Sequence, residues 1–121
     1  MSGLSDAQLY QYLADDPGGP VAMLNLLRFK PDGGAERYIE YVAAVQEFGP
    51  RFGLKLVFAG NGDTALVAGP GQDWDMVAIV EYPSRQAFVE MVRSPEYQAV
   101  EHLRAEALIE ATLQPTQALP V

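Results

Sequence analysis

Two segments of strand length are apolar on both faces, and this feature most constrains the fold. Residues Val21–Phe29 read VAMLNLLRF, and residues Trp74–Tyr82 read WDMVAIVEY. Successive side chains of a strand point to opposite sides, so a sheet that is covered on one side shows alternating apolar and polar residues. Neither segment alternates in this way. We therefore expect both sides of the sheet to be covered.

The rest of the chain predicts an alternation of helices and strands. Helices are expected where apolar residues recur at three- and four-residue steps, and strands where short apolar runs lie between glycines and prolines. Ser5 and Gln8 have the spacing of a capping box at the start of the first helix. Asn61–Gly62 is typical of a hairpin turn. Beside the two strands above, the expected elements are a helix at 4–14, a helix from 38 to about 48, strands at 54–59 and 64–68, helices after Ser84 and Ser94, and an edge strand at 108–114.

Without its first helix, the chain follows the split βαβ plan of ferredoxin-like folds. The predicted class is α+β, with one antiparallel sheet that carries its helices on one face. The 121 residues form a single domain, with a core at about 20–114, an N-terminal helix within 1–16 and a tail at 115–121. The helices are too few to cover both faces of the sheet. We therefore expect a homodimer in which two copies pack sheet to sheet.

Composition excludes several classes of partner and site. Sixteen acidic residues and eight basic ones give a net charge of −8, which repels nucleic acid and anionic membranes. The chain has no cysteine and one histidine, so no thiolate or multi-histidine metal site is expected. We expect neither a metal nor another cofactor. No apolar run has membrane-spanning length, and the first sixteen residues lack a signal-peptide pattern, so a cytoplasmic location is expected.

Three motifs, taken in order, resemble a known family. They are NLLRFK at Asn25–Lys30, WDMVAIVEYPSRQAF at Trp74–Phe88 and SPEYQAVEHLR at Ser94–Arg104. The chain resembles domain-of-unknown-function family 1330, within the dimeric α+β barrel superfamily, over most of residues 20–114. The resemblance implies a ferredoxin-like subunit that forms a two-sheet barrel with a second copy, and the first helix is extra to the shortest members. It implies no established reaction.

Related barrels, by the same resemblance, have diverse functions. They include cofactor-independent monooxygenases, muconolactone isomerases, polyketide cyclases, haem-dependent enzymes and effector-binding domains, so the fold does not fix the function. Nothing in the sequence around His102 indicates a haem ligand. In these relatives the small-molecule site usually lies between the sheet and the helices of one subunit.

Two polar residues are candidates for a functional role, and a third has a structural interpretation. Asn25 lies in the middle of an apolar strand, where a buried amide needs hydrogen-bond partners, so it either faces a ligand or belongs to a core network. His102 is the one imidazole and the first candidate for catalytic proton transfer. A lone histidine is more often structural. Asp75 is interpreted as a solvated or capping residue.

Arg28 and Glu81 lie near the ends of strands that we expect to run parallel and adjacent. The two side chains are predicted to form a structural ion pair, with an anion-binding role for Arg28 as the alternative.

A second group of candidates is aromatic or basic. Tyr97 and Arg104 are seven residues apart and therefore lie on one face of their predicted helix. They could present a phenol and a guanidinium to one cavity, or they could fix the helix to its neighbours. Tyr41 and Trp74 are further candidates for lining a ligand pocket, although aromatic residues at such spacings are more often part of the core.

These residues support two hypotheses of function. The first is a small-molecule-binding protein for an aromatic or carboxylate-bearing metabolite, with cofactor-independent chemistry of the monooxygenase, isomerase or cyclase type. Its pocket would contain Asn25, Arg28, Tyr41, Trp74, Tyr97 and Arg104, with His102 as the catalytic residue. The alternative is a non-catalytic ligand-binding or interaction module. The sequence leaves open whether the protein is an enzyme.

Overall fold

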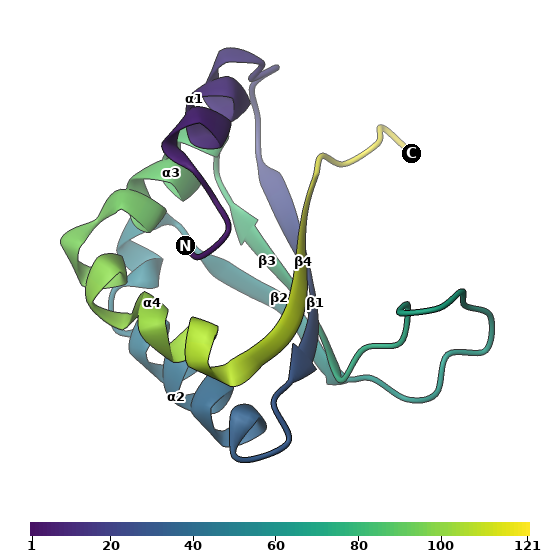
Figure 1. Ribbon diagram of the computed structural model, residues 1–121. Coiled ribbons are helices and arrows are strands. Elements are labelled where there is room, and N and C mark those ends of the chain that lie inside the picture. Colours follow the sequence, from purple (N-terminus) through teal and green to yellow (C-terminus); the bar gives the residue numbers. More distant parts are fainter.

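The computed structural model describes residues 1–121 and has one layer of helices on one face of a four-stranded sheet (Figure 1). The strands are ordered β2-β3-β1-β4, and every neighbouring pair is antiparallel. This is a ferredoxin-like subunit, so the predicted α+β class is confirmed. The elements are α1 (Asp6–Ala14), β1 (Val21–Phe29), α2 (Gly34–Gln46), a short 3-10 helix (Gly49–Phe52), β2 (Lys55–Asn61), β3 (Met76–Tyr82), α3 (Arg85–Arg93), α4 (Pro95–Ala107) and β4 (Leu108–Thr116).

Serine residues begin three of the helices, as their positions in the sequence predict. Ser5 caps α1, and both hydrogen bonds of its capping box with Gln8 are present. The Ser84 hydroxyl accepts from the backbone N–H of Ala87 at the start of α3. The Ser94 hydroxyl accepts from the N–H of Tyr97 at the start of α4. These bonds satisfy N–H groups that have no partner within the helix.

The predicted strand at 64–68 is wrong. β2 pairs directly with β3, and residues 62–75 form a long loop that projects from the sheet on the side away from the helices (Figure 1). Gly62 closes the base of this loop by donating its N–H to the Asp75 carbonyl at 2.8 Å. A Cβ atom at Gly62 would lie 1.8 Å from the Trp74 carbonyl oxygen, so the approach of the two segments requires glycine. β4 also extends to Thr116, two residues beyond the expected end.

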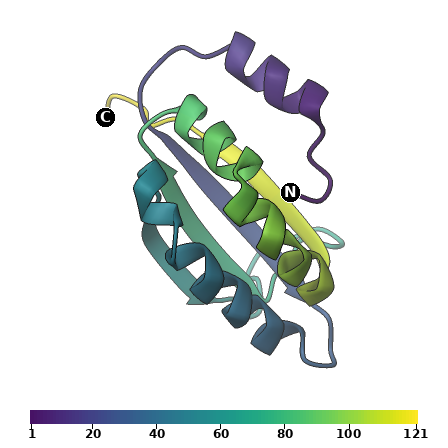
Figure 2. The ribbon, with the colours of Figure 1, turned by 90° about the vertical axis from the view of Figure 1, so that its left-hand side faces the viewer.

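The core lies between the sheet and α2, α3 and α4. On β1 the side chains of Val21, Met23 and Leu27 are buried against the helices. Across this layer Tyr97 of α4 is completely buried, with 0% of its surface exposed. α1 lies at one end of the helical layer (Figure 2), and Leu9 is its one buried residue. None of the helices combines the length and the apolar character that crossing a bilayer requires.

The opposite side of the sheet has no covering element in one chain (Figure 1). We call this side the open face. Its centre is apolar, because the register places Leu24 opposite Ile79 and Leu26 opposite Val77. Phe58 of β2 lies opposite Ile79 and is 55% exposed. The open face is therefore the second face that the apolar pattern of both strands predicts.

Candidate functional site

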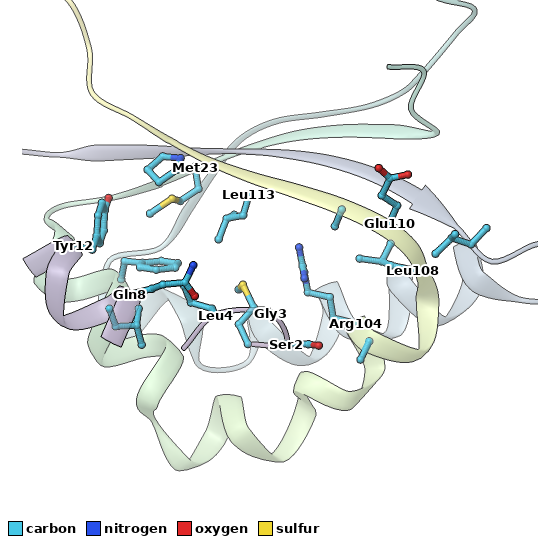
Figure 3. A pocket seen from close by; sticks show the side chains of 17 residues that line it. Ser2, Gly3, Leu4, Gln8, Tyr12, Met23, Arg104, Leu108, Glu110 and Leu113 are labelled. Carbon is cyan, nitrogen blue, oxygen red and sulfur yellow. The ribbon is translucent and has the colours of Figure 1, made fainter. Parts of the chain in front are cut away.

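A cavity of about 540 Å³ lies between α4, β4 and the N-terminal segment. Figure 3 shows the side chains that line it. Its walls are mostly apolar, and its volume lies in the range of small-molecule sites. We call it the outer cavity. Its lining includes Met1, Leu4, Tyr12, Met23, Phe88, Arg104 and Leu113.

Arg104 is the charged group that points into the outer cavity (Figure 3). Its side chain comes from the last turn of α4, and the residue is 7% exposed. No Asp or Glu side chain forms an ion pair with it, whereas Arg28, Arg37, Arg51, Arg85 and Arg93 all have carboxylate partners. Burying a charge without a partner costs several kcal/mol, on the order of the stability of a small domain. The positive charge of Arg104 therefore faces the cavity without a carboxylate counter-charge.

Glu110 also borders the outer cavity, yet its carboxylate does not reach Arg104. The side chain lies on the other side of β4, away from the cavity (Figure 3). There the Glu110 carboxylate accepts from Nε of Arg28 at 3.3 Å.

Three tyrosine phenols lie around Arg104. Tyr38 borders the guanidinium, and the Tyr41 and Tyr97 hydroxyl oxygens are 2.9 Å apart. Burial raises the pKa of all three phenols, and it raises that of Tyr97 to about 12. These phenols therefore remain protonated at neutral pH, where they can donate hydrogen bonds but cannot act as bases.

The raised pKa of Tyr97 predicts a loss of stability at alkaline pH. Below about pH 10 the phenol is protonated in both the folded and the unfolded chain, so it contributes no pH dependence. Between about pH 10 and pH 12 the unfolded chain releases this proton and the folded chain keeps it. The free energy of unfolding is therefore expected to fall by about 1.4 kcal/mol per pH unit for this group alone.

Urea unfolding across that pH range measures the effect. The fall should be shallower in Tyr97→Phe than in the wild type. Tyr10→Phe provides the matched control, because Tyr10 is 74% exposed, and it should behave as the wild type does. An equally steep fall in Tyr97→Phe would show that this phenol does not control alkaline stability.

A second, smaller space of about 100 Å³ lies deeper, between the sheet and α2. We call it the inner cavity. Asn25, Tyr38 and Tyr41 line it, and the rest of its wall is mostly apolar. Four side chains border both cavities, so the two spaces are neighbours: Met1, Met23, Phe88 and Leu113.

The structure brings four of the predicted site residues together. Tyr97 and Arg104 are both buried on the inner face of α4, as their seven-residue spacing predicts. Tyr41 joins them through its bond to Tyr97, and Asn25, which is 8% exposed, faces the inner cavity.

The prediction that His102 is catalytic finds no support in this geometry. His102 is exposed on α4 and lines neither cavity. Successive helix residues are turned by about 100°, so a residue two positions from the buried Arg104 points almost the opposite way. His102 therefore lies outside both cavities, and its catalytic role stays a prediction.

The predicted Arg28–Glu81 ion pair is wrong. β1 and β3 are antiparallel, and the register places Glu81 opposite Ala22, six residues from Arg28 along β1. Arg28 instead contacts the Asp73 and Glu110 carboxylates at 3.4 and 3.3 Å.

Arg28 and Trp74 hold the base of the projecting loop. The Arg28 guanidinium lies over the Trp74 ring at 4.8 Å and donates to the carbonyls of Gly71 and Asp73. Asp75 is exposed, and its carboxylate accepts from the N–H of Phe29 at the end of β1. Neither Arg28 nor Trp74 lines the outer or the inner cavity, so neither belongs to the site around Arg104.

The N-terminal segment is a part of the site that the sequence did not indicate. Residues 1–4 and α1 form one wall of the outer cavity, with Tyr12 at the end farthest from Arg104 (Figure 3). Arg85 of α3 holds this wall in place: its guanidinium lies over the Tyr12 ring at 4.2 Å and donates to the Tyr12 carbonyl at 2.7 Å. The Tyr12 hydroxyl is buried without a hydrogen-bond partner.

A family model described as "Domain of unknown function (DUF1330)" matches residues 33–113. The chain belongs to the DUF1330 family. The matched residues include α2 and α4, and with them the tyrosines and Arg104. β1 and α1 lie outside the matched range. No curated protein matches this DUF1330 chain.

Solved structures support the family and the fold. A Rhodopseudomonas palustris protein of unknown function, RPA0582, is 35% identical, with a TM-score of 0.86; the match covers 97% of this chain and 95% of that chain. A dimeric ferredoxin-like protein of unknown function from Thermobifida fusca is 14% identical, with a TM-score of 0.59 and coverage of 84% and 93%. The hydroxynitrile lyase from Passiflora edulis is 11% identical, with a TM-score of 0.64 and coverage of 87% and 98%. The last two likenesses concern the fold alone.

Proposed function

We propose that this DUF1330 protein binds a small organic anion with a mainly apolar body in the outer cavity. The observation that carries the proposal is the buried Arg104 guanidinium, which points into the cavity without a carboxylate partner. A bound carboxylate would supply the missing counter-charge and could accept two parallel hydrogen bonds from the guanidinium. The apolar walls would cover the body of the ligand.

Binding is better supported than catalysis. Arg104 and protonated phenols form an environment that stabilises negative charge on a ligand oxygen. Proton abstraction also needs a base, and the groups beside Arg104 do not supply one. The tyrosine pKa values are raised, His102 is outside the cavity, and Glu110 is turned away. We infer that the ligand arrives already ionised, as a carboxylate does at neutral pH.

Matched acids and amides test this proposal. Isothermal titration would compare monocarboxylates of increasing size, from butanoate through phenylacetate to naphthoate, with the corresponding amides. An acid and its amide differ little in shape, so a difference in their affinities reports the effect of the negative charge. At least one acid is expected to bind more than tenfold tighter than its amide, because a hydrogen bond to a charged group contributes about 1.5–3 kcal/mol. Equal affinity within every pair, or no binding by any acid, would overturn the proposal.

We also infer that the protein is a homodimer that buries the open face. Solved structures of the same fold from Thermobifida fusca, Bacteroides fragilis and a Jannaschia species are described as dimeric. In this chain the apolar centre of the open face, including Leu24, Leu26 and Ile79, has no cover of its own. Burying apolar surface contributes about 25 cal/mol per Å², so a second copy on this face is favourable despite the charge of −8 on each chain.

A further inference from the structure

Asn25 is a second polar group that the fold leaves without adequate partners. It lies in the middle of β1, the residue is 8% exposed, and asparagine is disfavoured in strands. Its amide makes one long hydrogen bond, in which Nδ2 donates to the Met23 carbonyl at 3.3 Å. Its Oδ1 accepts no hydrogen bond from the protein. This oxygen is not fully enclosed by protein atoms, and it keeps accessible surface beside the inner cavity, so a group in that space can reach it.

The inner cavity in front of Asn25 limits which ligand group can donate a hydrogen bond to Oδ1 of Asn25. The space of about 100 Å³ is much smaller than the outer cavity and admits a short substituent of a ligand. The Asn25 orientation is fixed chemically, because a carbonyl accepts and only the Nδ2 side of the amide can donate to Met23. The free atom is therefore an acceptor, and the group that meets it must donate. A hydroxyl meets this requirement, whereas an ether or a keto group does not.

The inner cavity adjoins the outer cavity, into which Arg104 points. Tyr38 borders the Arg104 guanidinium and also lines the inner cavity with Asn25. Met23 and Leu113 form a boundary shared by both cavities. A ligand whose anionic group meets Arg104 can therefore extend a short substituent past these side chains.

We propose that the ligand is a hydroxylated carboxylate, whose hydroxyl enters the inner cavity and donates a hydrogen bond to Oδ1 of Asn25. This inference rests on the proposed anion site at Arg104 and names the class of ligand for that site. Asn25 is then a specificity-determining residue, which distinguishes hydroxylated from unhydroxylated acids. A site built to bond a hydroxyl discriminates against an analogue that lacks it, because its own polar atom is then left unpaired.

The experiment compares phenylacetate with its 2-, 3- and 4-hydroxy derivatives by isothermal titration against four proteins. These are the wild type, Asn25→Leu, Asn25→Val and Gln46→Leu. Leucine is close to asparagine in size and removes both polar atoms. Gln46 provides the matched control, because its amide also borders the inner cavity but the residue is exposed. Asn25→Val is the second Asn25 variant. Valine is β-branched and favours strands, so this variant keeps the test valid if Asn25→Leu does not fold.

At least one hydroxylated acid is expected to bind the wild type about three- to tenfold tighter than phenylacetate. This preference should be lost in both Asn25 variants and kept in Gln46→Leu, while phenylacetate itself binds all four proteins similarly. If phenylacetate binds but no hydroxyl improves it, or if the preference survives in both Asn25 variants, the role of Asn25 is overturned and the anion site stands. If no acid binds any of the proteins, the anion site itself is overturned.

Discussion

Arg104→Met is expected to abolish carboxylate binding and to raise the melting temperature at the same time. The variant removes the guanidinium that would pair with the ligand, so the affinity for an acid should fall by about a hundredfold or more. It also removes a buried charge that has no carboxylate partner, and an apolar side chain of similar length keeps the cavity wall. Titration calorimetry and thermal unfolding of the same preparation measure both effects.

Arg37→Met is the matched control for this prediction. Arg37 is exposed and pairs with the carboxylates of Glu40 and Glu106 on the outside of the helices. Its replacement should leave carboxylate affinity unchanged and alter stability little, because exposed ion pairs contribute about 0–1 kcal/mol. A fall in melting temperature of many degrees in Arg104→Met would instead show that the guanidinium stabilises the fold through its contacts with the surrounding tyrosines. Unchanged acid binding in that variant would remove Arg104 from the site.

Leu26→Glu is expected to convert the dimer into a monomer. Leu26 lies on β1, the central strand of the open face, opposite Val77. A glutamate there would place a carboxylate from each copy in an apolar interface, in a protein whose charge is already −8. Desolvating these charges costs several kcal/mol per ion, and their repulsion adds to this. Sedimentation velocity or light scattering should therefore report half the wild-type mass.

Ile39→Glu controls for the general effect of adding a charge. Ile39 is an apolar residue of α2 that is 68% exposed, and it lies on the helical side of the molecule rather than on the open face. This variant should remain dimeric. A monomeric wild type would overturn the homodimer, and a dimeric Leu26→Glu protein would show that the interface lies elsewhere.

The local pattern was sufficient for most of the fold. The hydrophobic periodicity and the serine caps predict the helices, because both depend on neighbours within one turn. The apolar character of both faces of β1 predicts the open face. The pairing of strands was harder to predict, because it depends on the direction and register of segments that are far apart in the sequence. That is why the Arg28–Glu81 pair and the strand at 64–68 were wrong.

The candidate site was predictable only in part, for a similar reason. The seven-residue spacing of Tyr97 and Arg104 places both on one helix face, and the structure shows both buried. The same helical geometry argues against His102, which is two residues from Arg104. The wall formed by α1 could not be predicted, because α1 and β4 are far apart in the sequence. Nor does any spacing show that Arg104 lacks a carboxylate partner, since this depends on every chain segment around it.

The N-terminal wall and Arg104 come from different parts of the chain. Residues 33–113, which match the family, contain Arg104, whereas residues 1–4 and α1 precede them. Arg85, within the matched range, holds α1 through Tyr12, and the Met1 amino group pairs with the Glu101 carboxylate of α4 at 2.7 Å, so the wall is attached at both of its ends. Substitutions in the first twelve residues can then change the size and shape of the accepted ligand without disturbing its charge recognition.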